Sequence, residues 1–126
     1  MIKIEIPVPD IVITKKKQVG EPVEAAISSA YGFTDYHRIP RDKGGIIMFF
    51  NANDDLMFVG KARKLRPRVK RHFEDTVSPI KMHREEVYKI AVCVIEDPME
   101  REIYETYIIN MLKAKYNTEN VFYNIN

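Results

Sequence analysis

The sequence contains one cysteine, Cys93, and this scarcity excludes two classes of small protein. A single thiol builds neither an internal disulfide framework nor a multi-cysteine zinc site. Long apolar runs are absent as well, since none approaches about 18 residues, the length that a membrane-spanning helix needs. The first ten residues, MIKIEIPVPD, lack the basic-then-apolar pattern of a secretion signal. We therefore expect a cytoplasmic protein with no membrane contact.

Length and composition allow one globular domain. The chain has 126 residues, of which 45% are hydrophobic and 30% are charged, as in ordinary soluble proteins and unlike disordered ones. The formal net charge is only +2, but the basic residues are unevenly distributed along the chain. Their clustering, rather than the total charge, is the indicator of a binding partner.

Residues 1–43 are expected to form an arm and a short helix ahead of the main domain. The segment Ile2–Thr14 alternates loosely between apolar and polar residues but contains two prolines, so it predicts an extended arm or an edge strand. The run Lys15–Lys17 is typical of a solvated surface, with contact to nucleic acid as the alternative. A short helical pattern begins at Glu21, and a polar linker over 34–43 precedes the first clear strand.

The strands of the main domain are expected within residues 44–117. Ile46–Phe50 and Leu56–Val59 are apolar runs separated by the Asn- and Asp-rich stretch 51–55, a pattern that predicts a β-hairpin. The β-branched run Tyr88–Ile95 predicts a third strand.

Two helices are expected around these strands. Apolar residues at every fourth position predict one helix over Lys61–Phe73, and residues 74–86 fit either a loop or a further helical turn. The second helix is predicted to begin with Asp97 as N-cap and Pro98 at the first helical position, and to end near Lys115. Its expected apolar stripe consists of Met99, Ile103, Tyr107, Ile108, Met111 and Leu112.

The fold class predicted from these elements is α/β, more narrowly α+β. It comprises a small three-stranded, mainly antiparallel sheet flanked by helices, with an N-terminal extended arm and a short helix. The expected division is residues 1–43 for the arm and helix, 44–117 for the main domain and 118–126 for a C-terminal tail.

The predicted helix over Lys61–Phe73 is strongly basic. It contains seven lysines or arginines and no acid, so its positive charges have no internal compensation. Such a stripe favours contact with nucleic-acid phosphates, whereas a solvated helix face is the alternative interpretation. Arg68 and His72 lie one helical turn apart, and together could supply a fixed cation and a proton-transfer group. The residues expected to bind DNA are Lys61, Arg63, Lys64, Arg66, Lys70 and Arg71.

Read as a unit, the segment GIIMFFNANDDLMFVGKARKLRPRVKRHF resembles the opening motif of the GIY-YIG nucleases. The closest similarity is to the N-terminal nuclease domain of the UvrC excinucleases, and no gap is needed from Gly45 to Phe73. The later elements follow in order, with a helical carboxylate at Glu105 and the closing pair Tyr116–Asn117 twelve residues beyond it. The resemblance covers roughly residues 44–117.

The resemblance implies hydrolysis of DNA phosphodiesters with a single divalent cation, Mg²⁺ or Mn²⁺. Carried over by position, Glu105 is the metal ligand and Arg68 holds the phosphate. His72 and Lys61 assist proton movement or polarise the nucleophile, and Asn117 supports the glutamate end of the site. The implied partners are DNA and other repair or recombination proteins.

The two tyrosines that name the family are replaced. Ile47 stands where the first motif has its tyrosine, and Phe58 stands where the second has its own. One hypothesis is a divergent endonuclease in which another group, such as Tyr36 or His37 of the linker, replaces the missing hydroxyl. The alternative is a catalytically impaired module that still binds DNA.

A third hypothesis concerns the C-terminal tail. Val121, Phe122 and Tyr123 form a small apolar cluster in an otherwise polar, Asn-rich segment. Such a cluster could serve as a contact for another protein.

Overall fold

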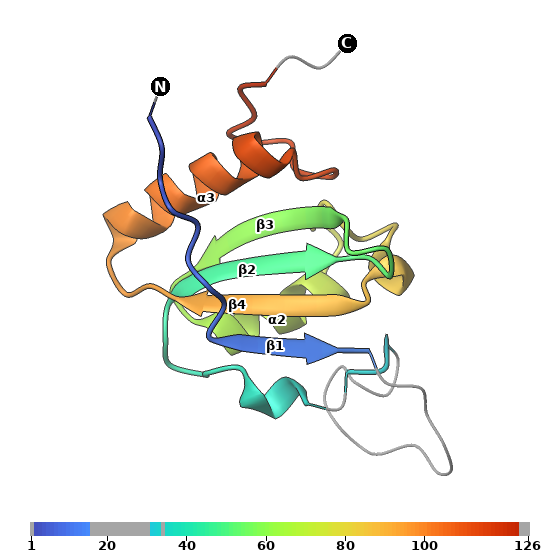
Figure 1. Ribbon diagram of the computed structural model, residues 1–126. Helices are drawn as coiled ribbons and strands as arrows, with labels where there is room; N and C mark the ends of the chain where they lie inside the picture. Colours follow the sequence, from blue (N-terminus) through green and yellow to red (C-terminus); the bar gives the residue numbers. More distant parts are fainter. Residues whose placement is uncertain (1, 16–30, 34, 124–126) are drawn as a thin grey trace.

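A four-stranded antiparallel sheet forms the middle layer of the molecule, with one helix packed on each face (Figure 1). The computed structural model describes residues 2–15, 31–33 and 35–123. The helix expected from Glu21 lies outside these ranges, as do Lys16 and Lys17. Throughout the described ranges, helices fall short of the length and hydropathy of a membrane span.

The sheet has the strand order β1-β4-β2-β3. The strands are β1 (Ile11–Thr14), β2 (Gly45–Phe50), β3 (Leu56–Ala62) and β4 (Lys89–Val94). The prediction of three strands is therefore wrong by one. The fourth is β1, which lies beyond the two prolines of the N-terminal segment and is free to pair with β4 at the sheet edge.

The predicted hairpin is confirmed in β2 and β3. Its turn is held by the side chain of Asn51, whose Oδ1 accepts hydrogen bonds from the main-chain N–H groups of Asn53 and Asp55, both at 2.9 Å. Asp54 has a φ of 64°, a conformation that Asp and Asn tolerate better than most residues. The asparagine- and aspartate-rich composition of this stretch therefore sets the turn that aligns β3 beside β2.

Helix α2 (Leu65–Glu74) covers one face of the sheet. Leu65, Val69 and Phe73 are buried against it, as their spacing predicts. The helix begins four residues later than expected, because Lys61 and Ala62 continue strand β3. Two short 3₁₀ helices complete the described elements: η1 (Tyr36–Arg38) precedes β2 in the sequence, and η2 (Arg84–Glu86) lies between α2 and β4.

Helix α3 (Pro98–Leu112) covers the opposite face and starts as predicted. Oδ1 of Asp97 accepts hydrogen bonds from the N–H groups of Met99 at 2.8 Å and Glu100 at 3.3 Å. The helix ends at Leu112 rather than near Lys115 because Lys113 adopts a left-handed conformation, with a φ of 54°.

The predicted apolar stripe of α3 is wrong for most of its members. Met99, Ile103, Met111 and Leu112 are exposed, whereas Ile108 is buried as predicted. The buried face consists of Arg101, Glu105, Ile108 and Ile109. Ile108 and Ile109 anchor the C-terminal half of the helix on the sheet, and the residues one and two turns earlier on that face are charged.

Gly44 and Gly45 provide a test of the packing at the start of β2. A Cβ on Gly45 would lie 1.9 Å from the main-chain oxygen of Cys93, whereas a Cβ on Gly44 would meet the movable side chain of Arg101 at 1.8 Å. Gly45→Ala should therefore lower the free energy of unfolding by about 3 kcal/mol, and Gly44→Ala by only about 1 kcal/mol. Urea unfolding of both variants measures the difference. Equal losses would contradict the backbone collision at Gly45.

Candidate active site

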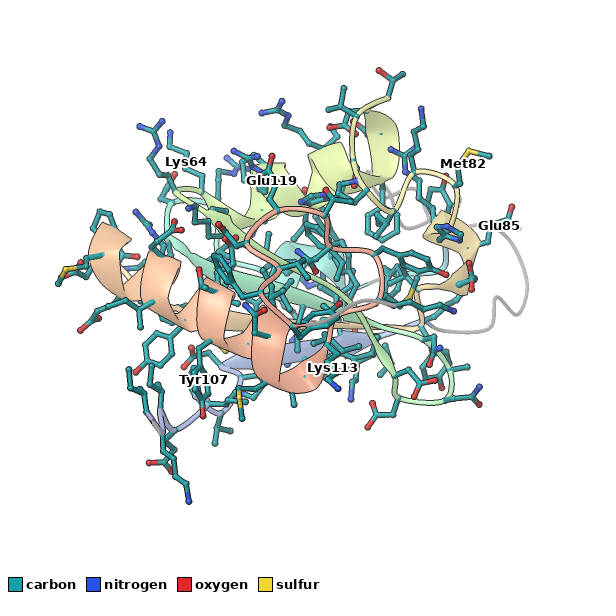
Figure 2. All side chains as sticks on the ribbon, turned by 90° about the horizontal axis from the view of Figure 1, so that it is seen from above. Lys64, Met82, Glu85, Tyr107, Lys113 and Glu119 are labelled. Atoms are coloured by element: carbon teal, nitrogen blue, oxygen red, sulfur yellow. The ribbon has the colours of Figure 1, made fainter. Side chains whose placement is uncertain are left out.

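A cavity of about 340 Å³ opens beside strand β3, between α2, α3 and the segment 117–120. Figure 2 shows this segment, which carries Glu119, lying between the two helices. The structure brings all five residues expected to be catalytic to the lining of this one cavity. They are Lys61, Arg68, His72, Glu105 and Asn117.

Glu105 contributes a carboxylate from the sheet-facing side of α3. Its residue is only 8% exposed, although glutamate on a helix is usually solvated. Burial raises the pKa of this carboxyl group, and Lys61 and a hydrogen bond from Asn120 partly oppose the rise. The Asn120 amide donates to Oε1 at 3.2 Å, and Nζ of Lys61 lies 4.0 Å from the same atom. The carboxylate is thus buried without a cation in close contact.

Lys61 stands at the cavity mouth and is shared between two acids of α3. Its closer ion pair is with Glu102, and Glu105 lies farther away. The lysine side chain is 43% exposed, so water screens both interactions. Lys61 is therefore placed to face an incoming anion while remaining tethered to α3.

His72 lies on α2, one turn after Arg68, and is buried against Phe58 and Phe49. Its Nδ1 is 2.7 Å from Oγ of Ser78, a hydrogen bond that fixes the ring. Burial, followed by the nearby positive charge of Arg68, lowers the pKa of His72 to about 4. The imidazole is consequently neutral near pH 7 and able to accept a proton, while the exposed Arg68 remains charged.

Asn117 fixes the C-terminal segment to the outer edge of β3. Its Oδ1 accepts from the N–H of Val59 at 2.9 Å, and its Nδ2 donates to the carbonyl of Val59 at 2.8 Å. The side chain thereby satisfies both main-chain groups of an edge-strand residue, as a neighbouring strand would. Three residues later, Asn120 reaches Glu105, so one short segment closes the cavity over the carboxylate.

The residues expected to bind DNA divide into two groups. Arg63, Lys64 and Arg71 are exposed, and Lys70 is half-buried with only a distant ion pair to Glu74, at 4.0 Å. Arg66 is engaged inside the molecule instead. Its guanidinium donates to the carbonyls of Ile39 at 2.7 Å and His37 at 2.5 Å, and thereby holds the linker that precedes β2.

The linker residues and Ile47 lie away from the cavity. The hydroxyl of Tyr36 donates to the main-chain oxygen of Arg66 at 2.7 Å, and burial raises its pKa. The side chain of His37 is exposed, and neither residue belongs to the cavity lining. Ile47 is fully buried in the core under α2, whereas Phe58 lines the cavity with a ring that has no hydroxyl.

Three residues of the site have no strong sequence signal. Ser78 orients His72, Asn120 contacts Glu105, and Glu119 adds a second carboxylate to the cavity lining. Asn120 has a φ of 58°, a conformation that asparagine adopts more readily than most residues. An asparagine in the polar tail was therefore the only sequence signal for this turn. Ser78 resembles any loop serine until the fold places it against α2.

The donor set fits a cation that prefers oxygen ligands and keeps much of its water. No cluster of three or more His, Cys, Asp or Glu side chains suited to a metal occurs in residues 2–15, 31–33 and 35–123. Glu105 is nevertheless desolvated and lacks a close positive partner, and Glu119 lines the same cavity. One carboxylate with water in the remaining positions suits Mg²⁺ or Mn²⁺ and does not suit structural zinc.

The lowered pKa of His72 makes the fold sensitive to acid. The pKa is about 4 in the folded chain against an ordinary 6.5, so between these values the unfolded chain binds a proton that the folded chain does not. The free energy of unfolding should therefore fall as the pH drops from about 6.5 to about 4, by at most roughly 3 kcal/mol from this group.

The measurement is urea unfolding of the wild type and of His72→Gln across this pH range. Glu105, with its raised pKa, acts in the opposite direction, but it is present in both proteins and cancels in the difference between them. The advantage of the wild type over the variant should shrink as the pH falls. A difference that is constant from pH 7 to pH 4 would rule out a neutral buried His72.

Comparisons with known proteins identify the family and the fold of the chain. A family model described as the UvrC-like GIY-YIG domain matches residues 43–118. The uncharacterized protein YurQ of Bacillus subtilis is 64% identical over 123 residues, which cover 98% of this chain and 99% of that protein. UvrABC system protein C of Wolinella succinogenes is 32% identical over 85 residues. That match covers 60% of this chain but only 14% of the relative.

A solved structure supports the same fold. The chain is similar to the GIY-YIG N-terminal endonuclease domain of UvrC from Thermotoga maritima, which was crystallised with its catalytic divalent cation, magnesium. The TM-score is 0.58 at 20% identity, covering 68% of this chain and 98% of that domain. A point mutant of the same domain, also bound to the catalytic cation, gives a TM-score of 0.59. With the family match over residues 43–118, the chain belongs to the UvrC-like GIY-YIG domain family.

Proposed function

We propose that this chain is a DNA endonuclease that requires a divalent cation, of the structure-specific or repair type that its resemblance to UvrC implies. The observation that carries the proposal is the burial of Glu105 at a cavity that Arg68, His72 and Lys61 also line. Among the described residues Glu105 is the only buried carboxylate. Burying this carboxylate lowers the stability of the fold, and a role in a phosphodiesterase site would explain why it is buried.

Glu105 is the residue that would hold the cation, with water completing the coordination. Once bound there, a divalent cation supplies Lewis-acid stabilisation of negative charge on the phosphate oxygens. The Asn120 amide holds the carboxylate in place, and the Asn117–Val59 pair holds the segment that carries Asn120. The glutamate is thus positioned before any ligand arrives.

The remaining residues have separate roles. Arg68 presents an exposed guanidinium, whose fork of donors matches phosphate oxygens, at the cavity. His72 is neutral and accepts a proton from the attacking water. The exposed cations Arg63, Lys64 and Arg71 bind the DNA backbone on either side of the cleaved bond.

A non-catalytic DNA-binding module is the second candidate, and the replaced tyrosines favour it. Phe58 leaves the cavity without a phenolic hydroxyl, and Ile47 is buried elsewhere. Glu105 argues against this candidate, since a buried carboxylate near a phosphate weakens binding unless a cation lies between them. A protein-docking role for the tail has less support, because Val121 and Tyr123 pack on the α3 side of the core and only Phe122 is largely exposed.

Glu105→Gln should abolish cleavage while preserving the shape of the side chain. Loss of a ligand to a catalytic cation removes several kcal/mol of transition-state stabilisation, which corresponds to a rate about 10²–10³-fold lower. The assay is nicking of supercoiled plasmid with Mg²⁺ or Mn²⁺. Glu100→Gln, an exposed glutamate of the same helix, is the matched control and should retain full activity.

An accompanying DNA-binding measurement shows whether a loss of cleavage in the variant is a loss of catalysis or a loss of binding. For the endonuclease, Glu105→Gln binds DNA in the absence of metal at least as tightly as the wild type, because a negative charge near phosphate is removed. Wild-type protein that binds DNA but does not cut it with either cation would leave the binding module as the function.

Phe58→Tyr restores a hydroxyl to the cavity and should raise the cleavage rate, by up to about 10²-fold if the hydroxyl takes part in proton transfer. The ring of Phe58 is 4.8 Å from that of His72, centroid to centroid, so the new group lies near the proposed proton acceptor. Ile47→Tyr is the contrasting variant and should unfold the protein, since Ile47 has no exposed surface. A rate unchanged in Phe58→Tyr would indicate that the site works without the phenol.

A further inference from the structure

A second cavity, of about 510 Å³, lies next to the candidate active site. Lys61 and Arg68 line both cavities, so the two are neighbours. The second cavity extends to Arg63 at the end of β3 and to Arg101 in the first turns of α3. The proposed function assigns Arg63 to the DNA backbone only in general terms, and it gives Arg101 no role.

Arg101 is a buried cation with little compensation. Its residue is 7% exposed, and its guanidinium makes one hydrogen bond, to the carbonyl of Ala62 at 3.3 Å. Among the described residues it forms no ion pair with a carboxylate. A guanidinium has five N–H donors, so most of them have no acceptor within residues 2–15, 31–33 and 35–123. Burying such a charge without a counter-ion is unfavourable.

The acids that could neutralise Arg101 are engaged elsewhere. The carboxylate of Glu96 accepts from the N–H of Gly44 at 2.9 Å. Glu102 lines the second cavity but is held by Lys61, and Glu105 is bound by Asn120 in the first cavity. Arg101 and Glu105 are four residues apart on one face of α3, yet they do not pair with each other.

The main chain is shaped around this guanidinium. Gly44 leaves a space in which Nη1 of Arg101 sits, and any Cβ there would lie 1.8 Å from it. The lining of the second cavity contains four cations, Lys61, Arg63, Arg68 and Arg101, and one acid, Glu102. The cavity therefore has excess positive charge and unused N–H donors, and an anion with several acceptor oxygens would match both.

We propose that Arg101 and Arg63 form a subsite for a second phosphate of the bound nucleic acid, next to the phosphate that Arg68 holds for cleavage. Arg101 supplies a buried fork of donors, and Arg63 supplies an exposed cation beside it in the same cavity lining. This subsite rests on the proposed endonuclease function, which it deepens by setting how the substrate backbone enters the active site. The group it takes is either an internal phosphodiester or a terminal phosphate, and the experiment separates the two.

The first arm uses inorganic phosphate and is independent of DNA. The protein is titrated with inorganic phosphate, and the NMR signals of the arginine Nε–H groups are followed. The chemical shift of the Arg101 signal should change and reach saturation with phosphate, and should change less with chloride at equal ionic strength. The change should be smaller in Arg63→Ala. Arg38 is an exposed arginine of η1, a short helix that lies beside the β1 edge of the sheet, away from α3 (Figure 1). Arg38→Ala is therefore the matched control and should leave the Arg101 shift unchanged. An Arg101 signal that ignores phosphate overturns the subsite.

The second arm measures binding of a fluorescent DNA duplex in EDTA, where no cleavage occurs. Arg101→Met should weaken binding about tenfold and reduce the salt dependence by about one phosphate contact, while Arg38→Ala changes binding less than twofold. A loss that appears only with a 5′-phosphorylated duplex assigns the subsite to a terminal phosphate, and an equal loss without the 5′-phosphate assigns it to an internal one. Unchanged affinity and salt slope in Arg101→Met exclude both.

Two further comparisons keep the outcomes distinct. If Arg101→Met fails to fold, as judged by circular dichroism, Arg63→Ala carries the DNA test, because the Arg63 side chain is exposed and forms no hydrogen bond or ion pair with the described residues. If the wild type neither binds nor cuts DNA, the proposed endonuclease function fails, and the phosphate titration alone still decides whether Arg101 binds an anion.

Discussion

The side chain of Asn117 makes the interaction on which the site depends, because it pairs with both main-chain groups of Val59. Strand β3 lies at the edge of the sheet, where unpaired main-chain groups would otherwise face water or another chain. The N–H groups of Lys115 and Tyr116 extend this pairing to the carbonyls of Leu56 and Met57. One continuous contact thus covers the sheet edge and brings segment 117–120 over the cavity.

Helix α3 shows how the fold sustains charges that burial disfavours. Its C-terminal half is anchored by Ile108 and Ile109, whose burial stabilises the fold by about 1.5–3 kcal/mol each. Its N-terminal half turns Arg101 and Glu105 inward, at a desolvation cost of the same order. The apolar half therefore offsets the polar half, and the two buried charged residues lie where the helix contributes least to the apolar core.

Local signals in the sequence were sufficient for most of the fold but not for the orientation of α3. The Asn51 turn, the Asp97 cap and the spacing of Leu65, Val69 and Phe73 act within a few residues, so they could be read directly. The buried face of α3 depends on contacts with β2 and β3, and its exposed methionines and isoleucine imitate a core stripe. The hydrogen bonds from the guanidinium of Arg66 could not be predicted for a similar reason, since the carbonyls that accept them belong to a linker distant in sequence.

The chemistry of the site follows from how the fold distributes charge among neighbouring groups. Arg68 and Lys61 keep their charges at the surface, whereas His72, packed between Phe58 and Phe49, is held neutral by the same burial that removes water from it. A neutral imidazole and a charged guanidinium can then coexist within one turn of α2, whereas an ionised imidazole beside Arg68 would be repelled. Replacement of the family's tyrosines therefore removes two hydroxyl groups, but His72 is still neutral and Arg68 and Lys61 are still charged.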